Sequence, residues 1–273
     1  MATTRREFIS GMAGITGISG MINHVDAQAS ETNTGIIRSA ADTVNIALIG
    51  CNSMGFYNLE NALKQEGVLC AALCDVDENV LNRRVKDVER IQKKTPLLYR
   101  DFRKLMENKD IDAVIIGTPD HWHCLPFIAA CEAGKDIYVE KPLANNIAEC
   151  ELMVKAARKY NRVVQVGQQQ RSGAHWKKAM DLIKGGGIGQ LRRVNIWANF
   201  NYGIGQPKVA DEPVPAGVDF DMWLGPAPAR SFNKTRFHGS WRMFWDYGGG
   251  LVTDWGVHLI DMALWATDAK TLP

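Results

Sequence analysis

Short apolar runs alternate with helix-like segments from residue 44 to residue 166, and this alternation limits the possible folds more than any other feature of the chain. The runs expected to form strands are residues 44–49, 68–74, 112–117, 136–139 and 163–166. The segments expected to form helices between them are residues 56–65, 78–92, 125–133 and 147–160. Strands and helices that alternate at this spacing build parallel crossover units. The sequence therefore predicts an α/β fold with a doubly wound parallel sheet.

A turn with two glycines follows the first of these strands and leads into the first helix. Its sequence is Gly50-Cys51-Asn52-Ser53-Met54-Gly55. Glycines permit a tight turn here, and the N-terminus of the following helix suits the pyrophosphate of a dinucleotide. Asn52 stands where the G-x-G-x-x-G pattern has its middle glycine, and Asn tolerates left-handed backbone geometry better than most residues. We expect cofactor contacts from Gly50, Asn52, Ser53, Met54 and Gly55.

An acidic residue, Asp75, follows the second predicted strand, 20 residues after Gly55. A carboxylate at this position accepts hydrogen bonds from the adenosine ribose hydroxyls and repels a 2′-phosphate. The alternative is a solvated loop carboxylate, since Asp77 and Glu78 lie beside it. Together with the glycine turn, Asp75 favours NAD over NADP as the cofactor.

Two polar segments follow later strands of the predicted sheet, Thr118-Pro119-Asp120-His121 and Glu140-Lys141-Pro142. Ligands of doubly wound sheets bind at the carboxyl ends of the strands. We therefore add Thr118, Pro119, His121, Glu140 and Lys141 to the expected cofactor contacts. Lys141 can also hydrogen-bond a reacting oxygen and stabilise developing alkoxide charge. Its alternative role is that of a surface lysine that neutralises Glu140.

Asp254 and His258 lie four residues apart in a helix expected over residues 251–265. Side chains at this spacing share one face of a helix. A carboxylate beside an imidazole fixes the orientation of the ring and supports the imidazolium that forms when it accepts a proton. The alternative is a pair on the surface of the helix.

The chain divides into two domains near Gly167, because residue types are unevenly distributed. All six cysteines lie between Cys51 and Cys150, whereas seven of the eight tryptophans lie between Trp176 and Trp265. We expect a cofactor domain over residues 44–167 and a substrate domain over residues 168–273. The net charge of +2 is too small to attract nucleic acid, so no nucleic-acid partner is expected.

The cysteines are expected to be buried free thiols. Cys70 and Cys74 would be about 13 Å apart in a strand, and Cys124 and Cys131 about 10 Å apart on a helix. A disulfide needs alpha carbons within about 7 Å. The segment from His121 to Cys124 contains potential metal ligands, but no second ligand pair of recognisable spacing accompanies it, so no metal is expected.

The first 29 residues resemble a twin-arginine export signal. Arg5 and Arg6 precede an uncharged run over residues 9–23, and Ala27-Gln28-Ala29 is a small-x-small cleavage pattern. We expect cleavage after Ala29, a linker over residues 30–43, no membrane anchor, interaction with the twin-arginine export machinery and a periplasmic location.

These motifs, in this order, resemble the glucose–fructose oxidoreductase / inositol dehydrogenase / rhizopine catabolism (Gfo/Idh/MocA) family. The resemblance covers residues 44–268 and includes the glycine turn, Asp75, Thr118-Pro119, Glu140-Lys141-Pro142, residues 168–171, and residues 248–250 with Asp254 and His258. It implies a Rossmann-type domain followed by an α+β domain with an open, mostly antiparallel sheet that covers the nicotinamide. Relatives often pair through that sheet, which implies a homo-oligomer.

The resemblance also implies the roles of the site residues. Lys141 and His258 flank the substrate hydroxyl, one of them acts as general acid/base, and Asp254 holds the substrate or the imidazole. Gln170 and Arg171 contact sugar hydroxyls. The chain stops just after residues 251–265, where relatives continue with more strands. We therefore expect an incomplete second domain with an unpaired sheet edge and exposed apolar surface.

The expected function is that of an exported oxidoreductase that moves hydride between tightly bound NAD and a secondary hydroxyl of a sugar, glycoside or cyclitol. One alternative is an NAD-dependent glycoside hydrolase or lyase that oxidises the sugar transiently. A second alternative is a non-catalytic sugar or dinucleotide sensor, against which the presence of Lys141, Asp254 and His258 argues.

Overall fold

The computed structural model describes residues 43–198 and 205–269. The predicted export signal, most of the predicted linker and the last four residues lie outside the described residues. None of the helices within the described ranges combines the length and the apolar character that crossing a membrane requires.

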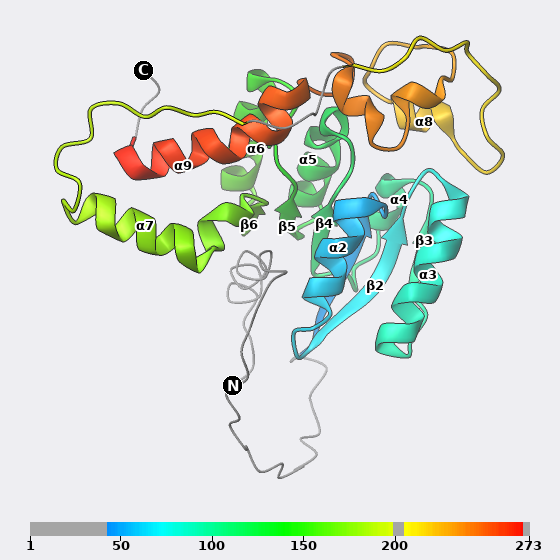
Figure 1. Ribbon diagram of the computed structural model, residues 1–273. Coiled ribbons are helices and arrows are strands. Elements are labelled where there is room, and N and C mark those ends of the chain that lie inside the picture. Colours follow the sequence, from blue (N-terminus) through cyan, green and yellow to red (C-terminus); the bar gives the residue numbers. More distant parts are fainter. Residues whose placement is uncertain (1–42, 199–204, 270–273) are drawn as a thin grey trace.

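A six-stranded parallel sheet forms the centre of the first domain (Figure 1). Its spatial order is β3-β2-β1-β4-β5-β6. The strands are β1 (Val44–Ile49), β2 (Val68–Cys74), β3 (Leu97–Tyr99), β4 (Ala113–Ile116), β5 (Asp136–Val139) and β6 (Val164–Val166). The order reverses between β1 and β4, and in doubly wound sheets this switch point opens the ligand crevice at the carboxyl ends of the strands. The predicted fold is confirmed.

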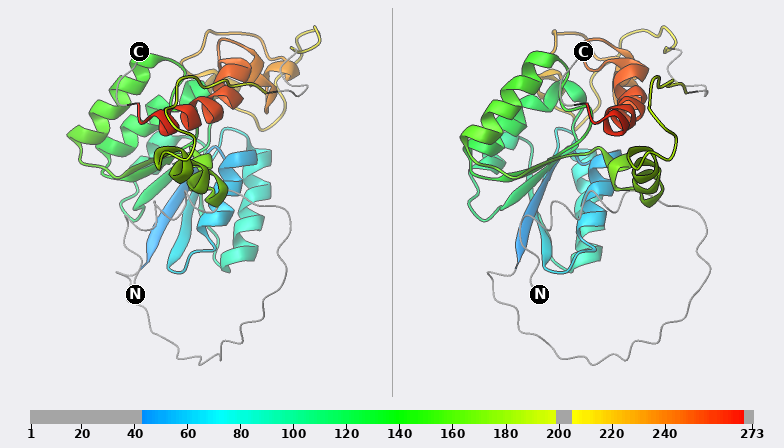
Figure 2. Two further views of the ribbon diagram at one scale, coloured as in Figure 1. Left: turned by 60° about the vertical axis from the view of Figure 1, so that its left-hand side comes forward. Right: turned by 90° about the vertical axis from the view of Figure 1, so that its left-hand side faces the viewer.

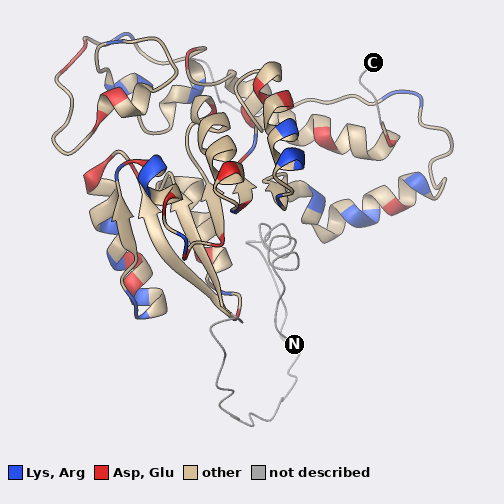
Figure 3. Ribbon diagram, turned by 180° about the vertical axis from the view of Figure 1, so that it is seen from behind, with Lys and Arg blue, Asp and Glu red and all other residues tan. Residues whose placement is uncertain are grey.

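Helices cover both faces of this sheet, and the side chains of β1 point alternately into the two cores that these helices form with it. Val44, Ile46 and Leu48 pack with α2 and α3, whereas Ala47 and Ile49 pack in the core that α4, α5 and α6 complete. These helices are α2 (Ser53–Ala62), α3 (Glu78–Gln92), α4 (Phe102–Met106), α5 (Cys124–Glu132) and α6 (Ile147–Lys159). On α3, charges of both signs occupy the outer face (Figure 3), and Val80, Leu81 and Val88 are buried.

The six cysteines are free thiols, and five of them are buried. The exception is Cys150, which is partly exposed. The expectation of free thiols is therefore confirmed.

The described residues after Val166 form helices and loops and no strand of a second sheet. The helices are η3 (Gln169–Ser172), α7 (Ala174–Lys184), α8 (Phe220–Leu224), η4 (Lys234–Arg236), η5 (Ser240–Met243), the π-helical η6 (Val252–Gly256) and α9 (Val257–Thr267). α7 lies alongside α9 at one end of the molecule (Figures 1 and 2).

The sheet edge expected in the second half is therefore not formed by the described residues, whereas the expected exposed apolar surface is present. Trp197 is 77% exposed and Trp245 is 87% exposed. Residues 191–198 are without regular structure, and Val194 and Ile196 are exposed as well. An extended segment becomes a strand only when a neighbour pairs with its backbone, and none of the described residues does so here.

A segment of the second half packs against the first domain instead. We call residues 216–242 the strap. Its aromatic side chains, among them Phe220, Trp223 and Trp241, form a third core with Tyr247, against which Val76 of the first domain packs. Val218 also forms an isolated antiparallel bridge with Asp77. The strap thereby becomes one wall of the crevice at the carboxyl end of the sheet.

Candidate functional site

Three glycines at the switch point, Gly50, Gly55 and Gly117, allow the backbone segments around them to pack directly against each other. A Cβ added at Gly55 would lie 2.1 Å from the carbonyl oxygen of Gly50, and one added at Gly117 would lie 2.5 Å from the Cα of Gly55. Gly50 also has a φ of 84°, which favours glycine. No side chain fits at these positions, so the turn after β1 packs directly against the end of β4. The sequence did not identify Gly117 as a site residue, although it directly follows the apolar run of β4.

Asn52 does not adopt the left-handed geometry that the sequence suggested. Its φ is −93° and its ψ is 166°, an extended conformation open to any residue, and the positive φ falls on Ser53 instead. Helix α2 therefore begins at Ser53, three residues earlier than expected. Its first turn holds no acidic residue, and the Asn52 side chain does not cap it. The free amides of that turn suit a pyrophosphate.

A cavity that is partly open to solvent lies at the N-terminal end of α2, between the sheet and the strap. The predicted cofactor contacts that line it are Gly50, Asn52, Ser53, Met54, Asp75, Thr118, Pro119, Glu140 and Lys141. The Thr118 hydroxyl is buried there without a hydrogen-bond partner. A glycine cradle, exposed helix amides and an unsatisfied hydroxyl fit a dinucleotide with its diphosphate at α2.

Asp75 holds the two loops that border this cavity. One carboxylate oxygen accepts a hydrogen bond of 2.7 Å from the amide of Cys51, and the other accepts one of 3.0 Å from the amide of Asp77. Burial raises the pKa of Asp75, and the two amide hydrogen bonds oppose that rise. Each oxygen keeps a further lone pair for a ribose hydroxyl, so Asp75 can serve both the loops and the cofactor.

Lys141 lies at the end of β5, and its side chain is fixed by the second half of the chain. Its Nζ donates to the Asp254 carboxylate over 2.6 Å and to the Asp254 carbonyl over 2.8 Å. Arg242 reaches the same Asp254 oxygen from 3.2 Å. Glu140 accepts hydrogen bonds from the Asn58 side chain and from the Lys141 amide instead of neutralising the ammonium group. Lys141 is thus presented to the cavity by the contact with Asp254.

His258 is buried beside this group, but the helix geometry differs from the expected one. Asp254 lies in the π-helical turn η6, and α9 begins only at Val257, which changes the relative direction of side chains four residues apart. The Asp254 carboxylate contacts Lys141 and Arg242, and Nδ1 of His258 is buried without a hydrogen-bond partner. Burial, together with the charge of Lys141, lowers the pKa of His258 to about 4.

Six predicted site residues lie outside the cavity lining, namely Gly55, His121, Gln170, Arg171, Asp254 and His258. The His121 ring is buried against Trp223 and Tyr247 and lies 3.1 Å from the Trp223 carbonyl, so it joins the strap to the first domain. Gln170 accepts a hydrogen bond from the indole of Trp176. Arg171 forms two 2.8 Å hydrogen bonds with Asp261 of α9. Neither Gln170 nor Arg171 reaches the cavity in this structure.

The cavity residues that the sequence did not assign to the site include Asp120, His238 and Arg242. Asp120 belongs to the segment after β4, and its position at a strand end was the available signal. His238 and Arg242 lie on the strap, which no periodic pattern connects with the sheet. Their place depends on tertiary packing.

Asp120 gives the site a pH dependence that stability measurements can detect. Burial raises its pKa to about 7, although Arg242 and Lys141 oppose the rise. The folded chain therefore holds a proton that the unfolded chain releases near pH 4, and the contribution of Asp120 to stability falls as the pH rises between these values.

We compare the free energy of unfolding of D120N with that of the wild type. The difference between them is expected to shift in favour of D120N by about 2–3 kcal/mol from pH 5 to pH 8. Urea unfolding of both proteins at the two pH values measures it, with D221N at an exposed carboxylate of α8 as the control. An advantage that does not change with pH would contradict the burial of an ionisable Asp120.

Comparisons with known proteins agree with this geometry. The model of the oxidoreductase family with the NAD-binding Rossmann fold, Gfo/Idh/MocA, matches residues 44–168. The model of its C-terminal alpha/beta domain matches residues 144–270.

Among curated proteins, a glycosyl hydrolase family 109 protein of Shewanella sp. (strain W3-18-1) is 29% identical over 203 residues. The match covers 68% of this chain and 44% of the relative, so the chain spans less than half the length of that protein.

Solved structures show the same fold. Scyllo-inositol dehydrogenase from Lactobacillus casei, with bound NAD(H) and scyllo-inositol, is 26% identical with a TM-score of 0.50, and the match covers 54% of this chain and 42% of that one. An NAD-binding protein from Listeria innocua is 22% identical with a TM-score of 0.58, over 81% of this chain and 54% of that one. Because the two family models together span residues 44–270, the chain belongs to the Gfo/Idh/MocA family of oxidoreductases, and NAD is the cofactor of its Rossmann domain.

Proposed function

We propose that the protein transfers hydride between a secondary hydroxyl of a sugar, glycoside or cyclitol and NAD that stays tightly bound. The observation that carries this proposal is the position of Lys141, which lines the dinucleotide cavity and is held there by Asp254. A fixed ammonium group at the end of the sheet can bind the oxygen whose charge develops during the reaction. The inositol complex of the Lactobacillus enzyme supports a polyhydroxylated substrate.

Oxidation of an alcohol removes a hydride from carbon and a proton from the hydroxyl. Bound NAD supplies the hydride acceptor. Lys141 would donate a hydrogen bond to the substrate oxygen, and Asp254 and Arg242 would keep the ammonium group in place. His258 is neutral over the physiological pH range because its pKa is lowered to about 4. A neutral imidazole can accept the hydroxyl proton, and a lysine can do so in its uncharged form, so Lys141 and His258 are the two candidates for general acid/base.

A panel of glycosides and cyclitols, incubated with the purified protein and analysed by mass spectrometry, tests the substrate class. We expect a product two hydrogens lighter than its substrate, together with reduction of the enzyme-bound cofactor. A panel that yields no such product with NAD-loaded protein would contradict the assignment.

A second candidate is favoured by the family 109 name of the Shewanella relative. A glycosidase of this type would oxidise the sugar, eliminate the aglycone and reduce the product, with no net change in the cofactor. Release of free sugar from an aryl glycoside without added oxidant would select this reaction. A stable keto-sugar would select the dehydrogenase.

The proposed location is the periplasm, and the support for it is the paired arginines and the cleavage pattern of residues 1–29. An enzyme outside the cytoplasm needs a cofactor that was loaded before export, because free NAD is not expected to be replenished there. Tight retention of NAD therefore belongs to the proposal. Assembly of a homo-oligomer through the second domain stays a prediction.

A further inference from the structure

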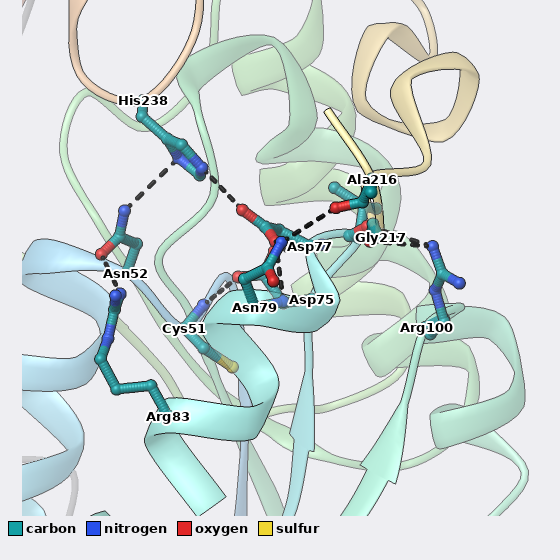
Figure 4. A network of polar contacts seen from close by, with 11 residues as sticks. Cys51, Asn52, Asp75, Asp77, Asn79, Arg83, Arg100, Ala216, Gly217 and His238 are labelled. Carbon is teal, nitrogen blue, oxygen red and sulfur yellow. Dashed lines mark hydrogen bonds and ion pairs between the residues drawn. The ribbon is translucent and has the colours of Figure 1, made fainter. Parts of the chain in front are cut away.

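The strap is joined to the loop after β2, where the adenosine side of a dinucleotide is bound in this fold. The Asp219 amide donates a hydrogen bond of 2.9 Å to the Val76 carbonyl, and the Glu78 amide donates one of 2.9 Å to the Gly217 carbonyl. The Arg100 guanidinium donates to the Gly217 carbonyl as well, over 3.3 Å. This end of the cofactor site therefore has a wall that the second half of the chain supplies (Figure 4).

His238 extends this wall across the opening between two loops. Its Nε2 lies 2.8 Å from the Asp77 carboxylate, and its Nδ1 lies 3.4 Å from the side-chain nitrogen of Asn52 (Figure 4). A neutral imidazole with its proton on Nε2 satisfies both contacts, since Nε2 then donates to Asp77 and Nδ1 accepts from Asn52. The Asn52 oxygen accepts a hydrogen bond from Arg83 in turn.

The two residues that His238 joins belong to the two loops on which a dinucleotide depends. Asn52 belongs to the glycine turn before α2, and Asp77 follows Asp75 and caps α3. His238 itself lines the cavity with Asn52 and Asp75. Its φ of 43° is unfavourable for a residue with a side chain, and such conformations persist where the surroundings hold them. The ring thus spans the cavity between its phosphate side and its ribose side.

We propose that His238, Asn52 and Asp77 form a clasp that closes the adenosine side of the NAD site and sets the rates at which the cofactor enters and leaves. The clasp rests on the proposed function, because it explains how the chain retains NAD. It differs from a simple contact with the cofactor. A clasp must open for entry as well as for release, whereas a contact stabilises only the bound state.

The H238A substitution is expected to accelerate both NADH association and NADH dissociation by about fivefold to tenfold, and to leave the dissociation constant within about threefold. This size corresponds to the loss of one partly exposed, charge-assisted hydrogen bond. Stopped-flow mixing of the cofactor-stripped full chain with NADH gives the association rate from the nicotinamide fluorescence. Displacement of bound NADH by excess NAD gives the dissociation rate.

Two further variants separate the clasp from a general loss of structure. H238Q is expected to restore rates close to those of the wild type, because a carboxamide can donate to Asp77 and accept from Asn52. H175A removes an exposed histidine of α7 and is expected to change neither rate. If H238A does not fold, D77N answers the same question. It keeps an oxygen to cap α3, weakens the bond to His238 and is expected to raise both rates about threefold.

Unchanged rates in folded H238A, or in D77N where H238A does not fold, would overturn the clasp. So would faster dissociation with unchanged association, because it would show a contact with the cofactor alone. A wild-type chain that binds no NADH would overturn the proposed function, and the clasp with it. Binding by the wild type with unaltered rates in the variants would overturn the clasp only.

Discussion

Replacement of Lys141 by methionine is expected to lower kcat by about three orders of magnitude while bound NAD is retained. The methionine side chain has a similar length but supplies neither a charge nor a hydrogen bond to the substrate oxygen. Removal of one preorganised donor at a developing oxyanion typically costs about 100-fold to 1000-fold in rate. Loss of a general acid/base would add to this cost. Single-turnover reduction of the bound cofactor by the substrate found in the panel measures the effect.

The control for this variant is K155M, at an exposed lysine of α6 that pairs only weakly with Glu151. It is expected to keep both turnover and NAD content. Turnover of K141M within about tenfold of the wild type would show that Lys141 has no part in the chemistry, and it would favour a different catalytic group.

Replacement of Gly55 by alanine is expected to abolish NAD binding or to weaken it more than 100-fold. The added Cβ would lie 2.1 Å from the Gly50 carbonyl oxygen, and this neighbour is backbone that also packs against Gly117. The turn must therefore open, which displaces the amides at the start of α2. Overpacking of a well-packed site costs about 1–3 kcal/mol in stability and sometimes more. Thermal unfolding and calorimetric titration with NADH measure the two effects.

The control is G134A, because Gly134 has a φ of 74° and a Cβ added there would meet no atom within 4 Å. The G134A variant introduces backbone strain without a steric conflict. We expect a loss of about 1 kcal/mol in stability and unchanged NADH affinity. G55A protein that binds NADH as tightly as the wild type would contradict the role of the glycine cradle.

The first domain was predictable from sequence because its signals are local. The bounds of β1, β2, β5 and α3 match the expected residues, since each is a continuous apolar run or an amphipathic helix between clear breaks. β3 and α4 were missed. β3 has three residues and exposes Leu97 and Leu98, so it carries no apolar periodicity.

The environment of the site residues was predictable only for those that directly follow a strand. The glycine turn, Asp75, Thr118 and Lys141 lie at the ends of β1, β2, β4 and β5, so the topology places them together. The environment of Asp254 depends on a π-helical turn and on Arg242, which no spacing rule gives. His121 was assigned to the cofactor because it follows Thr118-Pro119, but the aromatic side chains of the strap bury it.

The contacts of the strap with the first domain could not be predicted from the sequence. Trp223, one of the tryptophans after Gly167, packs on His121, and its carbonyl accepts a hydrogen bond of 2.8 Å from the Trp122 indole. These contacts join residues about 100 positions apart, and only the folded chain brings them together. The cofactor cavity is therefore built by both halves.

Tight retention of NAD is tested most simply by the NAD content of the purified protein after gel filtration. Denaturation of the protein peak, followed by mass spectrometry of the released small molecules, is predicted to recover about one NAD per chain. The stripped protein is predicted to bind added NADH again. Protein that elutes without NAD and shows no NADH binding in a calorimetric titration would show that the chain is not an NAD-dependent enzyme.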